Sequence, residues 1–300
     1  MTVRLRDEIE GMSRGWQWGR RRLLPGSVAA DRARSRAFPA SLRGPVASGA
    51  RNVIQSGLLS PLLDFELNRR VRGLDSLDSV EPPAVFVANH ASHLDAPVLL
   101  TSLPSSWRRR CVVGAASDYF YDVAWRAFAT SLVFNAFPIE RRGRLRGTKQ
   151  AGALLDDGWS LILFPEGTRS KDGWMGEFRP GAALIAMMKG VPVVPVALTG
   201  TYAAMPRGKS WPVSGRPEVT VRFGTAMRAA EGEGARDFNT RIRRRVAVLL
   251  NEERTTWWDA LRSDAEDDLD EGPDRDAAHW RRVWESTRPP SGPSRAWPRS

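Results

Sequence analysis

His90 and Asp95 stand five positions apart, and their types and spacing suit acid–base chemistry. The apolar residues 84–88 predict a short buried strand, and the polar run 89–95 leads into an apolar segment typical of a helix. A neutral imidazole at position 90 can take a proton from an alcohol, while the carboxylate at position 95 fixes the tautomer and stabilises the imidazolium. Ser92 lies between them as either a nucleophile or an N-terminal helix cap.

Three further blocks of sequence accompany this pair. Residues 164–170 (FPEGTRS) again follow an apolar run that predicts a strand. Together, residues 89–95 and 164–170 resemble the first and third signatures of the glycerolipid acyltransferase family, which includes the 1-acylglycerol-3-phosphate acyltransferases. Residues 137–141 (FPIER) resemble the second signature and residues 191–197 (VPVVPVA) the fourth. The four blocks follow the family's order, and the resemblance covers about residues 60–255.

The resemblance implies an enzyme that moves a fatty acyl group from a thioester to a glycerolipid hydroxyl. The donor would be acyl-CoA or acyl carrier protein. The acceptor would be 1-acyl-sn-glycerol-3-phosphate, giving phosphatidate, with glycerol 3-phosphate, other lysophospholipids or another lipid acceptor as close variants. His90 would be the general base and Asp95 its partner. Because a thiolate leaves readily, the reaction needs no covalent enzyme intermediate in principle. We expect no cofactor and no metal; the acyl thioester is a co-substrate.

The second signature supplies a candidate phosphate ligand. The resemblance assigns Arg141 to the acceptor's phosphate, and a guanidinium fork matches phosphate oxygens. Arg142 and Arg144 crowd the same loop. Either could share this role, or both could belong to a solvated basic loop.

In the family the third signature is associated with acceptor binding. Gly167 permits a tight turn and close backbone approach. Thr168 can donate a hydrogen bond, and Arg169 adds a positive group. Glu166 cannot bind phosphate directly, so we expect it to accept from a glycerol hydroxyl or to hold Arg141 or Arg169. A strand-end turn with a surface salt bridge is the alternative interpretation.

Two other classes of function remain as hypotheses. His90, His93 and Asp95 could be ligands of a metal-dependent hydrolase. The only other histidine is His279, far along the chain. The positive charge could also mark a non-catalytic binder of membranes or nucleic acid. That last hypothesis does not explain a base–carboxylate pair beside a phosphate-binding arginine.

The charge and the single cysteine restrict the partners and the location. The net charge is +11, and arginine supplies most of the positive charge. We expect an anionic membrane, rather than nucleic acid, as the macromolecular partner. Cys111 can form no disulfide within the chain, and we predict that it is a buried core residue. No stretch reads as a signal peptide or as a spanning helix of about 18 apolar residues. The prediction is therefore peripheral association with the cytoplasmic side of the cell membrane.

The chain divides into three parts by composition. Residues 1–42 are basic, and we expect them to be flexible or to lie on an anionic membrane surface. Residues 43–262 form the predicted acyltransferase domain. Its start, about residues 46–73, predicts an amphipathic helix interrupted by a proline, which either lies on the membrane or packs in the core. Residues 263–300 predict an acidic linker, a short helix within 276–287 and a disordered tail.

The order of apolar segments predicts an α/β fold with a layered, mostly parallel sheet flanked by helices. Short continuous apolar runs suggest strands buried on both faces. Pro195 inside one run suggests an edge strand or a bulge. The predicted strands are 84–88, 110–115, 133–138, 160–164, 192–199 and 218–223, and the predicted helices are 95–103, 123–131, 144–157, 180–189 and 235–262.

Overall fold

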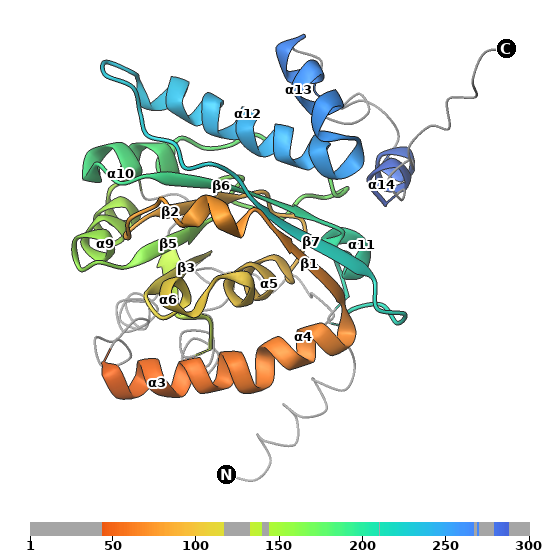
Figure 1. Ribbon diagram of the computed structural model, residues 1–300, viewed down its shortest axis with the longest axis horizontal. Helices are drawn as coiled ribbons and strands as arrows, with labels where there is room; N and C mark the ends of the chain where they lie inside the picture. The colour runs from red at the N-terminus through yellow and green to blue at the C-terminus, as the bar shows by residue number, and fades with distance from the viewer. Residues whose placement is uncertain are drawn as a thin grey trace, which may run out of the picture.

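The computed structural model describes residues 44–116, 133–139, 144–209, 211–266, 269 and 279–287. These residues form one seven-stranded sheet in the order β1-β7-β6-β2-β5-β3-β4 (Figure 1). Every neighbouring pair is parallel except β6 and β7. The predicted α/β fold with a mostly parallel sheet is therefore confirmed. The strands are β1 Asn68–Arg72, β2 Val85–Ala88, β3 Cys111–Ala116, β4 Ala136–Ile139, β5 Ser160–Leu163, β6 Val193–Thr199 and β7 Glu218–Phe223.

Helices cover both faces of this sheet. Helices α10 and α12 lie on one face, and α3, α4 and α5 lie on the other (Figure 1). Among the described residues, no helix is both long and apolar enough to cross a bilayer. The helical elements are α3 Pro45–Ile54, η2 Gln55–Leu59, α4 Ser60–Glu66, η3 Leu74–Leu77, α5 Asp95–Ser102, α6 Ser105–Arg108, α9 Arg144–Asp156, α10 Gly181–Lys189, α11 Thr201–Ala204, α12 Ala235–Arg254, α13 Trp257–Ala265 and α14 His279–Thr287.

Strand β2 is buried on both faces, as its apolar run predicts. Val85 and Val87 pack into one core cluster with Phe238 of α12. Phe86 points to the opposite cluster, which includes Leu99 of α5. Cys111 is also fully buried, as predicted. Because side chains alternate across a strand, β2 connects the two cores and ends in a fixed position between them.

The N-terminal helical segment differs from the prediction at its end. Residues 68–72 form the strand β1, which pairs in parallel with β7, rather than the last turn of a helix. Their sequence, NRRVR, has little apolar periodicity, so only the partner strand makes this segment extended. Before it, α3, η2 and α4 follow one another without a break. The π turn of η2 ends two residues before Pro61, and its wider winding accommodates the proline ring.

Pro195 lies in an interior strand, so the expected edge position is wrong and the expected bulge is right. Strand β6 pairs with β2 on one side and with β7 on the other. From Val193 to Val196 the chain advances three residues, while their partners Met227 and Phe223 are four residues apart. The extra residue on the partner side is a bulge.

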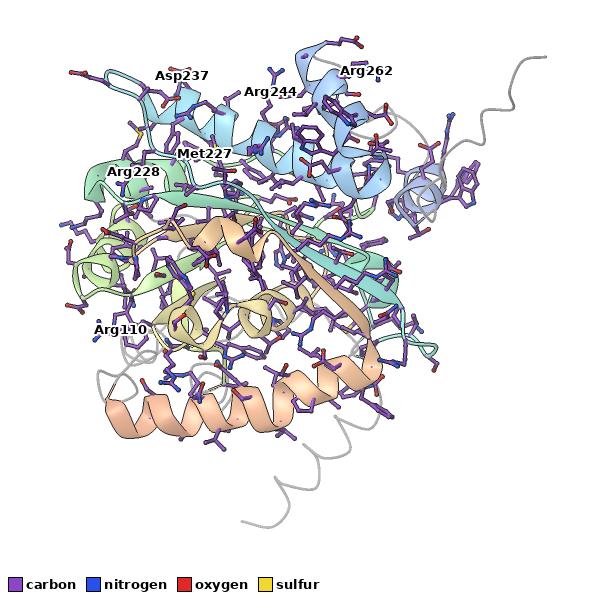
Figure 2. All side chains as sticks on the ribbon, in the orientation of Figure 1. Arg110, Met227, Arg228, Asp237, Arg244 and Arg262 are labelled. Carbon is purple, nitrogen blue, oxygen red and sulfur yellow. The ribbon has the colours of Figure 1, made fainter. Side chains whose placement is uncertain are left out.

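The predicted helix 235–262 is two helices, because the chain breaks at Thr255 and Thr256. Thr256 adopts an extended conformation and caps α13, accepting a hydrogen bond from the Asp259 backbone N–H at 3.2 Å. Arg244 lies on α12 (Figure 2). Its guanidinium contacts Asp264 on α13 at 2.6 Å and so joins the two helices. The predicted helix within 276–287 is confirmed as α14. The predicted helix 123–131 lies outside the described residues.

Two ion pairs on β1 and β7 have the same length but different burial, and they make a matched test. The Arg222 guanidinium contacts Glu252 of α12 at 3.0 Å, with the side chains 19% and 5% exposed. Arg70 contacts Glu218 at 3.0 Å, with both side chains about half exposed. We expect Arg222→Met to lower the free energy of unfolding by about 3–5 kcal/mol, because the buried Glu252 carboxylate loses its ion-pair partner. Arg70→Met should cost less than about 1 kcal/mol.

Urea unfolding of both variants measures the difference. Equal losses would show that Arg222 does not stabilise the contact between β7 and α12 electrostatically.

Candidate active site

His90 and Asp95 are in direct contact at the end of β2. The His90 Nδ1 atom lies 2.7 Å from Asp95 Oδ2. The Asp95 side chain is fully buried, whereas that of His90 is 22% exposed. With Nδ1 donating to the carboxylate, Nε2 keeps its lone pair and can accept a proton. The geometry therefore suits the base-and-partner arrangement predicted for these two residues.

The same carboxylate oxygen closes the turn that carries His90. Asp95 Oδ2 also accepts hydrogen bonds from the backbone N–H groups of Ala91 and Ser92, each at 2.7 Å. Three donors on one oxygen compensate for removing a charged group from water. The spacing of five residues is thus a structural requirement as well as a chemical one, because the carboxylate must reach back to the start of its own turn.

The Ser92 hydroxyl is engaged inside the fold, and Ser92 is not at the N-cap position that the sequence suggests. Its hydroxyl is fully buried, donates to the Met205 carbonyl at 2.8 Å and accepts from the Leu94 backbone N–H at 3.3 Å. Helix α5 begins at Asp95, with Leu94 at the N-cap position. Ser92 therefore ties the turn to the end of α11.

Glu166 supports the backbone of His90, a role that the sequence analysis missed. Its Oε1 accepts the His90 backbone N–H at 2.7 Å, and its Oε2 accepts the Gly176 N–H at 3.0 Å. Both oxygens are engaged by backbone groups, rather than by the arginine or hydroxyl partners expected from the sequence. Burial raises the pKa of Glu166 to about 8, against the opposing effect of these two hydrogen bonds. A carboxylate directly after a buried strand was the available signal.

The third signature wraps around His90. The Phe164 ring stacks on the imidazole, with centroids 4.4 Å apart and an interplanar angle of 25°. The Ser170 backbone N–H donates to the His90 carbonyl at 2.7 Å. Gly167 has φ +71°, and a Cβ there would come within 3.0 Å of the Arg179 guanidinium carbon. The predicted tight turn at Gly167 is therefore present, and it places the signature against the loop that carries His90.

Thr168, Arg169 and His93 lie around the same loop. Thr168 is exposed on the turn and Arg169 is half-buried. Burial lowers the pKa of His93 to about 4, and the positive charges of Arg169 and His90 add to this effect. In the described part of the chain, no three His, Cys, Asp or Glu side chains converge as metal ligands. The geometry thus gives the hydrolase hypothesis no ligand set at His90, His93 and Asp95.

The predicted phosphate ligand, Arg141, lies outside the described residues, as does Arg142.

Asn89 anchors the end of β2 to β6, and the sequence analysis did not assign it this function. Its amide oxygen accepts from the Leu198 N–H at 2.8 Å, and its amide nitrogen donates to the Leu198 carbonyl at 2.9 Å. The buried amide thereby continues the ladder between β2 and β6 beyond the last backbone pair. Asn89 thereby fixes the point at the end of β2 from which His90 extends.

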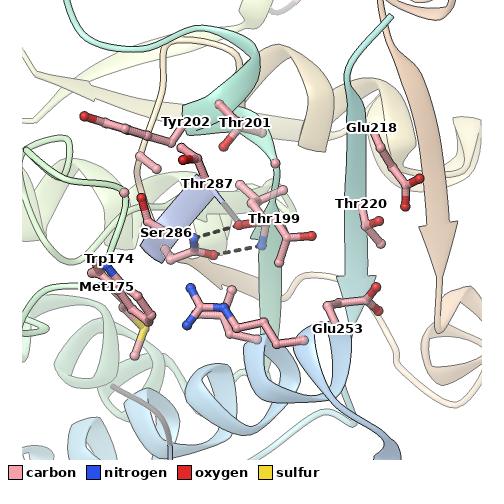
Figure 3. A pocket seen from close by; sticks show the side chains of 18 of the residues that line it. Trp174, Met175, Thr199, Thr201, Tyr202, Glu218, Thr220, Glu253, Ser286 and Thr287 are labelled. Carbon is pink, nitrogen blue, oxygen red and sulfur yellow. Dashed lines mark hydrogen bonds between the residues drawn. The ribbon is translucent and has the colours of Figure 1, made fainter. Parts of the chain in front are cut away.

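A cavity of about 500 Å³ lies beside this turn. It is bounded by the ends of β6 and β7, by α12 and by α14 (Figure 3). Asn89 and Ala91, the neighbours of His90, form part of its wall. On the opposite side, the Arg254 guanidinium lies 3.9 Å from the centroid of the Trp174 ring. The cavity is therefore mixed in character, with aromatic, hydroxyl and charged groups.

Comparisons with known proteins found acyltransferases of similar sequence. Residues 68–199 match the family model described as Acyltransferase. The chain is 38% identical over 138 residues to the chloroplastic 1-acyl-sn-glycerol-3-phosphate acyltransferase BAT2 of Brassica napus, covering 46% of this chain and 39% of that protein. It is 38% identical over 92 residues to the 1-acyl-sn-glycerol-3-phosphate acyltransferase of Pseudomonas aeruginosa, covering 29% of this chain and 33% of the relative. The matched region thus spans well under half of these curated relatives.

A solved structure has the same fold. The crystal structure of the 1-acyl-sn-glycerophosphate acyltransferase from Thermotoga maritima aligns with a TM-score of 0.56 at 22% sequence identity. The alignment covers 75% of this chain and 88% of that chain. Sequence identity at this level bears on the fold, and it supports the α/β sheet with flanking helices described above.

The raised pKa of Glu166 predicts a pH dependence of stability. Since the pKa of Glu166 rises from 4.5 to about 8 on folding, the folded chain binds the proton of this carboxyl group more tightly than the unfolded chain does. The stability of the wild type relative to Glu166→Gln should be greatest below about pH 4.5. It should decrease as the pH rises to about 8 and stay constant above that, because glutamine does not titrate.

Thermal unfolding of both proteins across this range is the measurement. Parallel profiles for the two proteins would show that Glu166 is not held protonated.

Proposed function

We propose that this chain, whose residues 68–199 match the Acyltransferase family model, transfers a fatty acyl group to the free hydroxyl of 1-acyl-sn-glycerol-3-phosphate. The observation that carries this proposal is the 2.7 Å contact between His90 and a fully buried Asp95 at the end of a parallel strand. The names of the curated relatives support the choice of acceptor. The product would be phosphatidate.

The proposed reaction needs one base. His90 Nε2 takes the proton of the acceptor hydroxyl as its oxygen attacks the thioester carbonyl. The new C–O ester bond forms, the C–S bond breaks, and the imidazolium returns the proton to the leaving thiolate. Asp95 stabilises the imidazolium through Nδ1. Positioned acid–base help of this kind is worth about 10²–10⁴-fold in rate.

The donor in this proposal is acyl-CoA or acyl carrier protein. Either thioester has a thiolate leaving group, so the proposed mechanism needs no covalent enzyme intermediate, and it includes no cofactor or metal.

The acceptor's phosphate is proposed to bind at the second and third signatures. Arg141 would present its guanidinium fork to the phosphate, with Arg169 as a second cation and the Thr168 hydroxyl as a donor. The effect of Arg169 on His93 supports a positive potential beside the catalytic loop. Gly167 would allow the backbone of the turn to approach the ligand. Glu166 would act through His90 rather than on the acceptor.

The proposed membrane contact is the outer side of the N-terminal helical segment formed by α3, η2 and α4. Val53, Leu58 and Phe65 are 69%, 65% and 74% exposed there. Large apolar side chains at this exposure suit insertion at a lipid interface. The proposed location is peripheral, on the cytoplasmic side of the cell membrane, with an anionic surface attracted by the net charge of +11.

We expect His90→Ala to lower the rate of acyl transfer by about 10²–10⁴-fold, because the acceptor hydroxyl loses its base. The measurement is thiol release from palmitoyl-CoA, with and without 1-acylglycerol-3-phosphate. His93→Gln is the matched control, since it removes an imidazole from the same loop.

Near-normal transfer by a folded His90→Ala protein would rule out this base. Thiol release that does not depend on the acceptor would instead indicate a thioesterase. If palmitoyl-CoA gives no release, palmitoyl-acyl carrier protein is tested in the same way.

We expect Leu58→Ser with Phe65→Ser to weaken binding to anionic vesicles by tenfold or more, because each lost apolar side chain removes about 1.5–3 kcal/mol when fully buried. Co-sedimentation with phosphatidylglycerol vesicles measures this. Trp258→Ser is the control, since Trp258 is 70% exposed but lies on α13, across the molecule from α4 (Figure 1). An equal loss in the control would refute this membrane-facing surface.

A further inference from the structure

The C-terminal helix α14 is attached to the loop that follows the third signature. Arg282 Nε lies 2.5 Å from Asp172 Oδ2, with the two side chains 13% and 17% exposed. The Ser286 hydroxyl donates to the Asp172 carbonyl at 2.6 Å. The Trp174 indole N–H donates to the Arg282 carbonyl at 2.8 Å. Three polar contacts thus join a helix outside residues 68–199 to one short turn.

This turn is itself tied to the catalytic histidine. The Ser170 hydroxyl donates to Asp172 Oδ1 at 3.0 Å and accepts the Gly173 N–H at 2.8 Å. The Ser170 backbone N–H donates to the His90 carbonyl at 2.7 Å. A continuous chain of hydrogen bonds therefore runs from Arg282 through Asp172 and Ser170 to the backbone of His90.

The electrostatics of Asp172 depend on this attachment. Burial raises the pKa of Asp172, but the hydrogen bonds from Arg282, the Trp174 backbone and Ser170 outweigh burial and lower it overall. Asp172 is thus held as a carboxylate with both oxygens engaged. Without the Arg282 side chain, a mostly buried anion would lose its cation, and the turn would have reason to rearrange toward water.

A second attachment keeps the turn in the fold. The Tyr202 hydroxyl of α11 donates to the Lys171 carbonyl at 2.9 Å. Loss of the Arg282 contact should therefore shift the turn without detaching it. The helix also forms part of the cavity wall, where Ser286 and Thr287 lie near Trp174 and Tyr202 (Figure 3).

We propose that Arg282 is a positioning residue for the transfer reaction: by fixing Asp172, it holds the turn 170–174 and, through that turn, the backbone of His90. The inference rests on the proposed function, because it takes His90 as the base. It assigns α14 a part in the active site, although none of its residues belongs to the four signatures. Small displacements of a base relative to its substrate are costly in rate, which makes this contact a sensitive one.

The test compares Arg282→Ala with Arg281→Ala. Arg281 is its neighbour on α14, is 60% exposed and, among the described residues, pairs along the helix with Glu285, so both variants lose one cation from the same helix. We expect Arg282→Ala to lower kcat by about tenfold with little change in KM for either substrate. Arg281→Ala should match the wild type. Arg282→Lys, which can still donate to Asp172, should recover part of the loss.

A spectroscopic measurement separates this inference from the proposed function. The chain has three histidines, so the His90 ring signals can be assigned in ¹H–¹⁵N spectra by comparison with His→Gln variants. We expect Arg282→Ala to shift the His90 signals and Arg281→Ala to leave them in place.

Two results would overturn the inference: unchanged His90 signals in Arg282→Ala, or equal kcat in the two alanine variants. Shifted His90 signals in a protein that transfers no acyl group from any thioester would uphold the coupling from α14 to His90 and reject the proposed function instead.

Discussion

The carboxylate of Asp95 is the constraint on which the candidate site depends. One of its oxygens receives the imidazole and two backbone N–H groups, so the turn after β2 closes around a buried anion. That arrangement requires a strand ending at Ala88, a helix beginning at Asp95 and nothing longer between them. The same three hydrogen bonds fix the imidazole tautomer and its direction. The Asp95 carboxylate thus serves both the proposed chemistry and the local fold. A change in the spacing of His90 and Asp95 would lose both functions.

The sheet order then determines what surrounds this turn. Strand β2 lies between β5 and β6, so the third signature, which follows β5, and the end of β6 flank His90 on either side. Val87 is in register with Leu163 on one side and Pro195 on the other. Two buried polar side chains then fix the ends of these strands: Asn89 bridges to β6, and Glu166 bridges from the end of β5 to the His90 backbone. Segments more than a hundred residues apart therefore meet because parallel strands end at one edge.

The sequence predicted the parts of this arrangement that depend on local pattern. Apolar runs located β2, β5 and β6, and the spacing of His90 and Asp95 indicated their contact. Partners that depend on tertiary structure were not accessible. The polar run NRRVR becomes a strand only because β7 lies beside it, and Glu166 has the backbone as its partner only because β5 and β2 are neighbours. Ser92 looked like a cap by its position, yet its hydroxyl reaches Met205, whose location no local pattern encodes.

The protonation state of Glu166 affects the electrostatics of the candidate site. Two carboxylates lie near His90, and the negative charge of Asp95 is one of the causes that raise the pKa of Glu166. Burial is the larger cause, and with a pKa of about 8 Glu166 is mostly neutral near pH 7. A neutral carboxyl group still accepts one N–H strongly through its carbonyl oxygen, while its hydroxyl oxygen is a weaker acceptor for the other, as expected if the hydrogen bonds from His90 and Gly176 oppose the effect of burial. It therefore holds the backbone of His90 without adding a second anion to a loop where a phosphorylated acceptor is proposed to bind. A fully ionised Glu166 would compete with Asp95 for the imidazolium and would repel that phosphate, so the burial of Glu166 serves the same proposed chemistry as the positive charge of Arg169.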